Sequence, residues 1–248
     1  MAYRYDTDLE FLGQMLSEDL NDLVYCLSHD KDGENRFMEE LTTNDAYKVY
    51  CPDHNKYWRL IAEEIQCFGA NTLVTIFRGK GVEYKEVLTD VCDKLKVNYN
   101  NASSTEIIEN NLLMKILTDA LEKMKPEEIK DLANEMGINN TKGITAQSMI
   151  ASFQTIFIAG GFWSYQLTVI IANQVWRILF NRGLSLAANS GLTRAMSILA
   201  GPIGWVITGI WTAIDIAGPA YRVTIPAVIQ VAVLRQKHLY GNAEMEPM

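Results

Sequence analysis

The chain has 248 residues, of which 48% are hydrophobic and 21% charged, and its formal net charge is −8 at pH 7. A chain of this length can bury a sizeable core as one large domain or as two small ones. The charges are unevenly divided, because residues 1–142 carry 16 basic and 27 acidic side chains and residues 143–248 carry 6 basic and 3 acidic ones. The acidic first part argues against nucleic-acid binding, which needs a basic surface.

All the cysteines lie in the acidic part, without a C-x-x-C pair: Cys26, Cys51, Cys67 and Cys92. Residues 1–12 are polar and have neither the basic region nor the apolar region of a secretory signal. We therefore expect reduced thiols in an intracellular protein.

The first part has apolar residues at helical spacing. Ser17 is placed to cap a helix, and one apolar face follows it, made of Leu20, Leu23, Val24 and Leu27. A longer helix is predicted over residues 57–77, where Trp58, Ile61, Ile65 and Phe68 share a stripe.

Two further helix starts are marked by local signals. Residues 103–106 read Ser-Ser-Thr-Glu, a capping box that predicts a long amphipathic helix to about Met124. Pro126 suits the first turn of the next helix, and Gly137 suits its end. Residues 137–143 are polar and are the predicted linker between the two parts of the chain.

The second part begins with 34 uncharged residues, 143–176. About 20 apolar residues are enough for a helix to span a bilayer, so the length permits a span, although glutamines and asparagines interrupt the run. Gln147, Gln154 and Gly161 recur every seven residues and should form a polar stripe on one helical face, until Gly160 and Gly161 loosen the helix.

A second uncharged run covers residues 195–214. Within it, Pro202 removes a helical hydrogen bond, so we expect a kink there or a new helix starting at Ile203. Glycines at positions 201, 204 and 209 would permit close approach of another helix. Gly218-Pro219 predicts a turn, after which the chain is mostly apolar to Leu234.

These patterns predict an all-α protein with two parts. Residues 1–142 form an acidic, soluble helical domain, and residues 143–248 form an apolar helical region, associated with membrane or with a partner, whose helices are broken by glycine and proline.

Tryptophan, arginine and turn residues mark the predicted contact surface of the apolar region. They resemble the residues that anchor helices at membrane interfaces, and they also resemble a buried helical interface. Asp215 and Arg222 flank the predicted turn, where they would either pair between two antiparallel helices or stay exposed. The candidate contact residues are Trp163, Trp176, Arg177, Arg182, Trp205, Trp211, Asp215, Tyr221 and Arg222.

No motif predicts a metal site, a cofactor site or catalysis. Two C-x-x-H pairs, Cys26 with His29 and Cys51 with His54, could in principle supply four zinc ligands. Cys26 falls on an apolar face, however, where free cysteine packs as a small hydrophobic residue. The Asp/Gly turn at residues 30–34 lacks the spacing of a calcium loop, and we see no nucleophile–base arrangement, so we predict no metal, no cofactor and no enzymatic activity.

Three stretches together resemble the YaaW family of uncharacterised bacterial proteins: WRLIAEEIQCFG at residues 58–69, RGKG at 78–81 and AYRVTIPAVIQ at 220–230. The family has been grouped with the ubiquinol–cytochrome c chaperone family, helical factors implicated in assembling a respiratory complex. The resemblance implies a chaperone role and transfers no catalytic residue. The chain departs from the family pattern at Cys26, where an aliphatic residue is expected.

The leading functional hypothesis is a non-enzymatic, membrane-associating helical protein with a cytoplasmic regulatory or partner-binding domain, located at the inner membrane. Its partners would be membrane lipid or a membrane protein, with homo-oligomers left open. One alternative is a soluble, chaperone-like assembly factor. The other is a pore-forming or membrane-permeabilising effector.

Overall fold

The computed structural model describes residues 3–36, 40–69, 81–138, 141, 143–186, 194–217 and 220–241. For residues 69, 194–197, 211 and 213–217 only the backbone is described. These residues form helices joined by turns, with one isolated β-bridge between His29 and Asn35 among the residues described. The all-α prediction is confirmed.

The first part of the chain contributes short helices and one long one. They are η1 (Glu10–Gln14), η2 (Ser17–Leu20), α1 (Asn21–Ser28), α2 (Asp45–Tyr50), η3 (His54–Tyr57), α3 (Trp58–Gly69), α5 (Tyr84–Lys94), α6 (Thr105–Leu121) and α7 (Pro126–Glu135). The second part contributes longer helices. They are α8 (Ala146–Ala159), α9 (Phe162–Phe180), α11 (Arg194–Ala217) and α12 (Tyr221–Tyr240).

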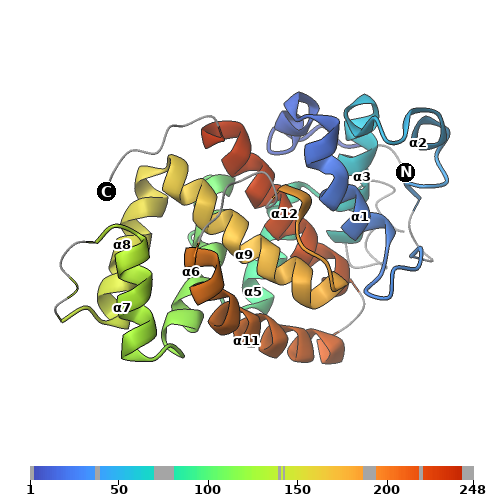
Figure 1. Ribbon diagram of the computed structural model, residues 1–248. Helices are drawn as coiled ribbons and strands as arrows, with labels where there is room; N and C mark the ends of the chain where they lie inside the picture. Colours follow the sequence, from blue (N-terminus) through green and yellow to red (C-terminus); the bar gives the residue numbers. More distant parts are fainter. Residues whose placement is uncertain are drawn as a thin grey trace.

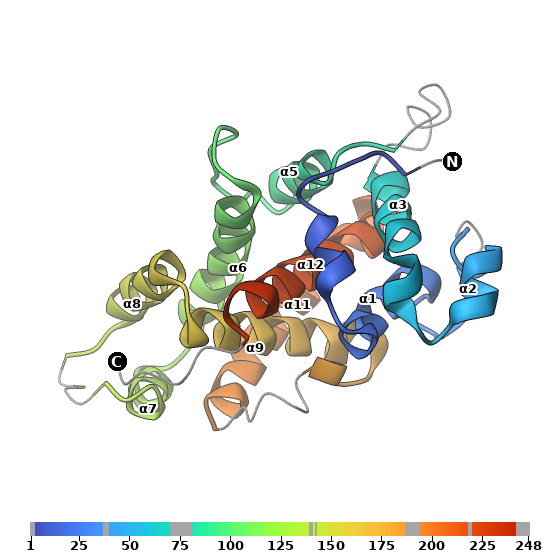
Figure 2. The same cartoon turned by 90° about the horizontal axis from the view of Figure 1, so that it is seen from above.

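Helix α12 crosses the middle of the bundle (Figures 1 and 2). It packs against α9 and α11 of the second part and against α1, α3, α5 and α6 of the first. Its residues 223–234 are all buried. Residues from both sides of position 142 therefore contribute to one hydrophobic core. The division into two domains at residue 142 stays a prediction.

The signals predicted for the limits of α6 and α7 act as expected. Ser104 is the N-cap of α6 and accepts a hydrogen bond from the backbone N–H of Ile107, while Pro126 begins α7 and Gly137 follows its end with φ +79°. The prediction for Ser17 was wrong. Its hydroxyl bonds Asp53 and the backbone N–H of Asn55 instead, because η2 starts as a 3₁₀ turn at Ser17 itself.

The uncharged run after residue 143 folds as two helices. Gly160 and Gly161 have φ values of +69° and +82° and turn the chain by 115° between α8 and α9, a backbone path open mainly to glycine. Gln147 and Gln154 lie exposed on the same face of α8, as predicted.

Helix α11 continues through Pro202, so of the two outcomes expected there the new helix start at Ile203 does not occur, and the kink stays a prediction. The turn predicted at Gly218-Pro219 lies outside the described residues. No single helix among the described residues has both the length and the apolar character of a membrane span; α8 and α9 reach that threshold only when counted together across their bend.

Candidate functional site

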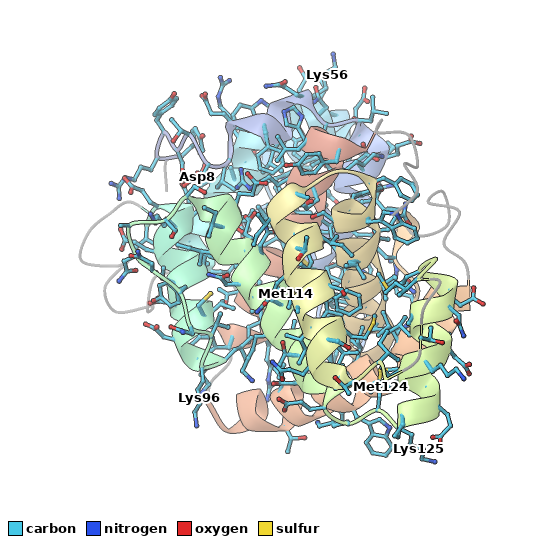
Figure 3. The ribbon with its side chains drawn as sticks, turned by 90° about the vertical axis from the view of Figure 1, so that its left-hand side faces the viewer. Asp8, Lys56, Lys96, Met114, Met124 and Lys125 are labelled. Atoms are coloured by element: carbon cyan, nitrogen blue, oxygen red, sulfur yellow. The ribbon has the colours of Figure 1, made fainter. Side chains whose placement is uncertain are left out.

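A buried ion pair lies where α12 meets α6. Arg235 donates from Nε to the Glu109 carboxylate at 2.8 Å and from Nη2 to the backbone oxygen of Asp8 at 2.8 Å. The Tyr84 hydroxyl donates to the other oxygen of Glu109 at 2.8 Å. These four residues are named the Arg235 network. Asp8 lies at the N-terminal end of α6 (Figure 3), where Thr105 donates to its carboxylate at 2.6 Å.

Burial and pairing oppose each other within the Arg235 network. Burial raises the pKa of Glu109, whereas Arg235 and the Tyr84 hydroxyl act to lower it. Burial is the largest single effect on Arg235 and acts to lower its pKa, but Glu109, Tyr84 and Asp8 together outweigh it, so the guanidinium pKa is raised. The Arg235 guanidinium also lies over the Phe11 ring, 4.6 Å from its centroid. With its donors engaged in this way, the network is built to hold helices together rather than to transfer protons to a substrate.

Two further ion pairs join the acidic first part to basic residues of the second. Lys237 pairs with Asp19, whose side chain is buried. Asp22, fully buried, accepts from Arg182 at 3.3 Å and from the backbone N–H of Ser185 at 2.7 Å. Basic side chains of the second part of the chain therefore pair with acidic side chains of the first part within the folded protein.

The predicted contact residues of α9 and the segment after it are separated by the fold. Trp176 is fully buried, Trp163 is partly buried and Arg177 is exposed. Arg182 pairs with Asp22 and lies over the Tyr25 ring, 4.3 Å from its centroid. This stretch is thus largely an internal packing surface.

The remaining predicted contact residues lie on α11 and α12. Trp205 is 74% exposed on the outer side of α11. The side chains of Trp211 and Asp215 lie outside the described residues. Tyr221 and Arg222 are partly buried, with the Lys94 ammonium over the Tyr221 ring. Trp205 is thus the most exposed of the aromatic side chains in this set that the structure describes.

The two C-x-x-H pairs do not converge on a metal geometry. Cys26 is buried and donates to the backbone oxygen of Leu23, and burial raises the pKa of its thiol. The His29 ring stacks on Tyr25, and His54 bonds the Tyr57 hydroxyl while Cys51 is exposed. Within the described part of the chain, no three His, Cys, Asp or Glu residues are grouped to hold a metal ion.

The sequence analysis did not identify Glu109 and Arg235 as candidate site residues. A local signal did exist, because Glu109 shares the buried face of α6 with Leu112 and Ile116, where a charge needs a partner. Nothing local identifies that partner, which lies 126 residues further along the chain.

Sequence comparison identifies relatives of this chain in two bacteria. The chain is 53% identical over 248 residues to a UPF0174 protein of Helicobacter pylori strain J99, an alignment that covers 100% of this chain and 98% of that protein. It is 31% identical over 239 residues to the UPF0174 protein YaaW of Escherichia coli K12, covering 94% and 95%. The chain belongs to the UPF0174 (YaaW) family. The family resemblance inferred from the sequence is confirmed.

Two family models match different segments of the chain. Residues 53–229 match the ubiquinol–cytochrome C chaperone model, so the chain belongs to that family as well. Residues 3–37 match a domain of unknown function, DUF3944. No solved structure matches the chain significantly. The chaperone match indicates a chaperone-like factor.

Proposed function

We propose that this protein is a non-enzymatic, chaperone-like assembly factor that works at the cytoplasmic face of the inner membrane. Its apolar C-terminal part would contact membrane lipid or a membrane protein. The chaperone family match over residues 53–229 supports the assembly role. The closed ion-pair network around Arg235 fits a scaffold rather than an enzyme.

The observation that carries the proposal is the outer face of α11. Trp205 is 74% exposed there, and its exposed neighbours on the helix are Gly201, Thr208, Gly209 and Thr212. A Cβ atom at Gly201 or Gly209 would meet nothing within 4 Å, so another helix has room to approach closely. The sequence of this helix carries no charge from residue 195 to residue 214.

Tryptophan is suited to such a contact. Its ring buries a large apolar area while its N–H keeps a polar partner, which is why it is enriched at membrane interfaces and in protein interfaces. Removing the ring from water contributes roughly 2–3 kcal/mol.

Membrane fractionation followed by alkaline extraction tests the proposal on the full-length protein. We expect the wild type to sediment with membranes and Trp205→Ser to move towards the soluble fraction. Val49→Ser is the matched control, because Val49 is 70% exposed on α2, away from the proposed face. The proposal is wrong if the wild-type protein stays in the soluble fraction and binds neither vesicles nor a membrane protein.

A further inference from the structure

Helix α8 has one apolar, buried face and one mostly polar, exposed face, and neither carries a charge. The buried face consists of Met149, Ile150, Phe153, Ile156 and Phe157. The opposite, exposed face carries the polar side chains of Gln147, Ser148, Gln154 and Thr155, and near its C-terminal end Ile158, which is 87% exposed. Helices with a bulky apolar face and a distinct polar face can lie in the plane of a bilayer interface.

The attachment of α8 to the bundle is apolar. The helix lies at the edge of the molecule (Figures 1 and 2), beside α6, whose Met114 is labelled in Figure 3. It packs on α6, α7 and α9. Within the described part of the chain, no hydrogen bond or ion pair joins an α8 side chain to another helix. Helix α12, in contrast, forms ion pairs with α6 through Arg235 and with η2 through Lys237. Lipid acyl chains can replace contacts of this kind without leaving a polar group unpaired.

Glycines in a left-handed conformation flank α8 on both sides. Gly143 precedes the helix with φ +74°, and Gly160 and Gly161 follow it with φ +69° and +82°. A Cβ atom at Gly143 or at Gly161 would meet nothing within 4 Å. Neighbouring side chains therefore leave room at Gly143 and Gly161, whereas the Tyr240 hydroxyl lies close to Gly160 and has to move away for the chain to change direction there.

We propose that α8 leaves the bundle and lays its apolar face into a loosely packed lipid surface. The inference rests on the proposed membrane function and identifies the segment and the kind of partner. At 1.5 Å per residue, the 14 residues of α8 extend about 21 Å, less than the roughly 30 Å of a hydrocarbon core, so the helix lies on the membrane and does not span it.

The absence of charge on α8 defines the lipid preference. Helices with Lys and Arg on their polar face bind anionic lipid in a salt-dependent way, and α8 has neither. Its binding should therefore depend on acyl-chain exposure, which is greater in strongly curved vesicles, and should be insensitive to salt.

The test uses full-length protein with neutral phosphatidylcholine vesicles, small and large. Gly161→Ala disfavours the left-handed backbone of the docked state and should raise the population with α8 released by about tenfold. Gly143→Ala should act in the same direction from the other end of the helix. Gly33→Ala is the matched control, because Gly33 has φ +83° in a turn between His29 and Asn35, with only an ordinary contact at 3.6 Å.

We expect Gly161→Ala and Gly143→Ala to bind small vesicles about tenfold more tightly than the wild type, with little change for Gly33→Ala. Hydrogen exchange should show amides of residues 146–159 exchanging faster in both variants without lipid, while α12 stays protected. Gln154→Lys should add binding to anionic vesicles that salt abolishes. This substitution lies on the exposed face and leaves the apolar face unchanged.

The outcomes separate the two proposals. If the wild type binds vesicles but the glycine variants bind like Gly33→Ala and exchange in α8 is unchanged by lipid, the role of α8 is wrong and the membrane function stands. If no variant binds any vesicle although circular dichroism shows each to be folded, the role of α8 is wrong, and the fractionation experiment alone decides the proposed function.

Discussion

Glu109 on α6 and Arg235 on α12 are joined by a 2.8 Å ion pair although 126 residues separate them in the sequence. Their side chains are only 2% and 12% exposed. Water cannot replace either partner at this depth, so the pair couples the long helix of the first part to the last helix of the chain.

Breaking this pair should be costly. We expect Arg235→Met or Glu109→Leu alone to lower the free energy of unfolding by about 3–5 kcal/mol, because each leaves a buried charge without its partner. The double variant should recover much of that loss, since it removes both charges. Urea unfolding of the four proteins forms a double-mutant cycle, and additive losses would contradict this account.

Replacing Asp22 should lower the free energy of unfolding more than replacing Arg182, which pairs with it. Asp22→Ala leaves the Ser185 backbone N–H without its acceptor and should cost about 2–4 kcal/mol. Arg182→Gln should cost about 1 kcal/mol or less, because the Arg182 side chain is 38% exposed and its ion pair is screened by water. Thermal unfolding monitored by circular dichroism compares the two, and equal losses would argue against this ranking.

We expect the burial of His54 to make the folded protein less stable in mild acid. Burial lowers its pKa below the ordinary value of 6.5, against a smaller opposing effect of Asp53. The unfolded chain therefore binds a proton more readily than the folded protein, so this contribution to stability is lost as the pH falls from about 6.5 towards the folded-state pKa. Urea midpoints measured from neutral to mildly acidic pH should fall less in His54→Gln, and identical pH profiles would exclude His54 as the cause.

The α8–α9 bend should tolerate substitution unequally at its two glycines. A Cβ atom at Gly160 would lie 2.5 Å from the Tyr240 hydroxyl, whereas one at Gly161 would meet nothing. Gly160→Ala should therefore cost about 1–3 kcal/mol more than Gly161→Ala in urea unfolding. Adding Tyr240→Ala should remove that excess, and a persistent difference would mean that backbone strain alone separates the two positions.

Local chemistry allowed much of the helical order to be predicted. Ser104, Pro126 and Gly137 act within a few residues of their own position, so the limits of α6 and α7 could be read from the sequence. Pro202 does not begin a new helix because a proline penalty is local, while α11 gains its stability from packing against α6, α7 and α9.

The candidate site was harder to predict because its partners are far apart in sequence. The apolar character of α12 was evident, but its place at the centre of the bundle depends on contacts with helices from both parts. The exposure of Trp205 and the burial of Trp176 likewise follow from packing, since the two residues have similar apolar neighbours in the sequence.

The central position of α12 also affects how the protein is made. At about 5–20 residues per second, a ribosome needs about 10–40 seconds to extend the chain from the end of α1 to the start of α12. Throughout that interval α1 lacks the helix on which it packs, and so do α3 and α5 from the time they are synthesised. The nascent chain therefore exposes apolar surface until α12 has been synthesised, and the bundle can close around α12 only after that.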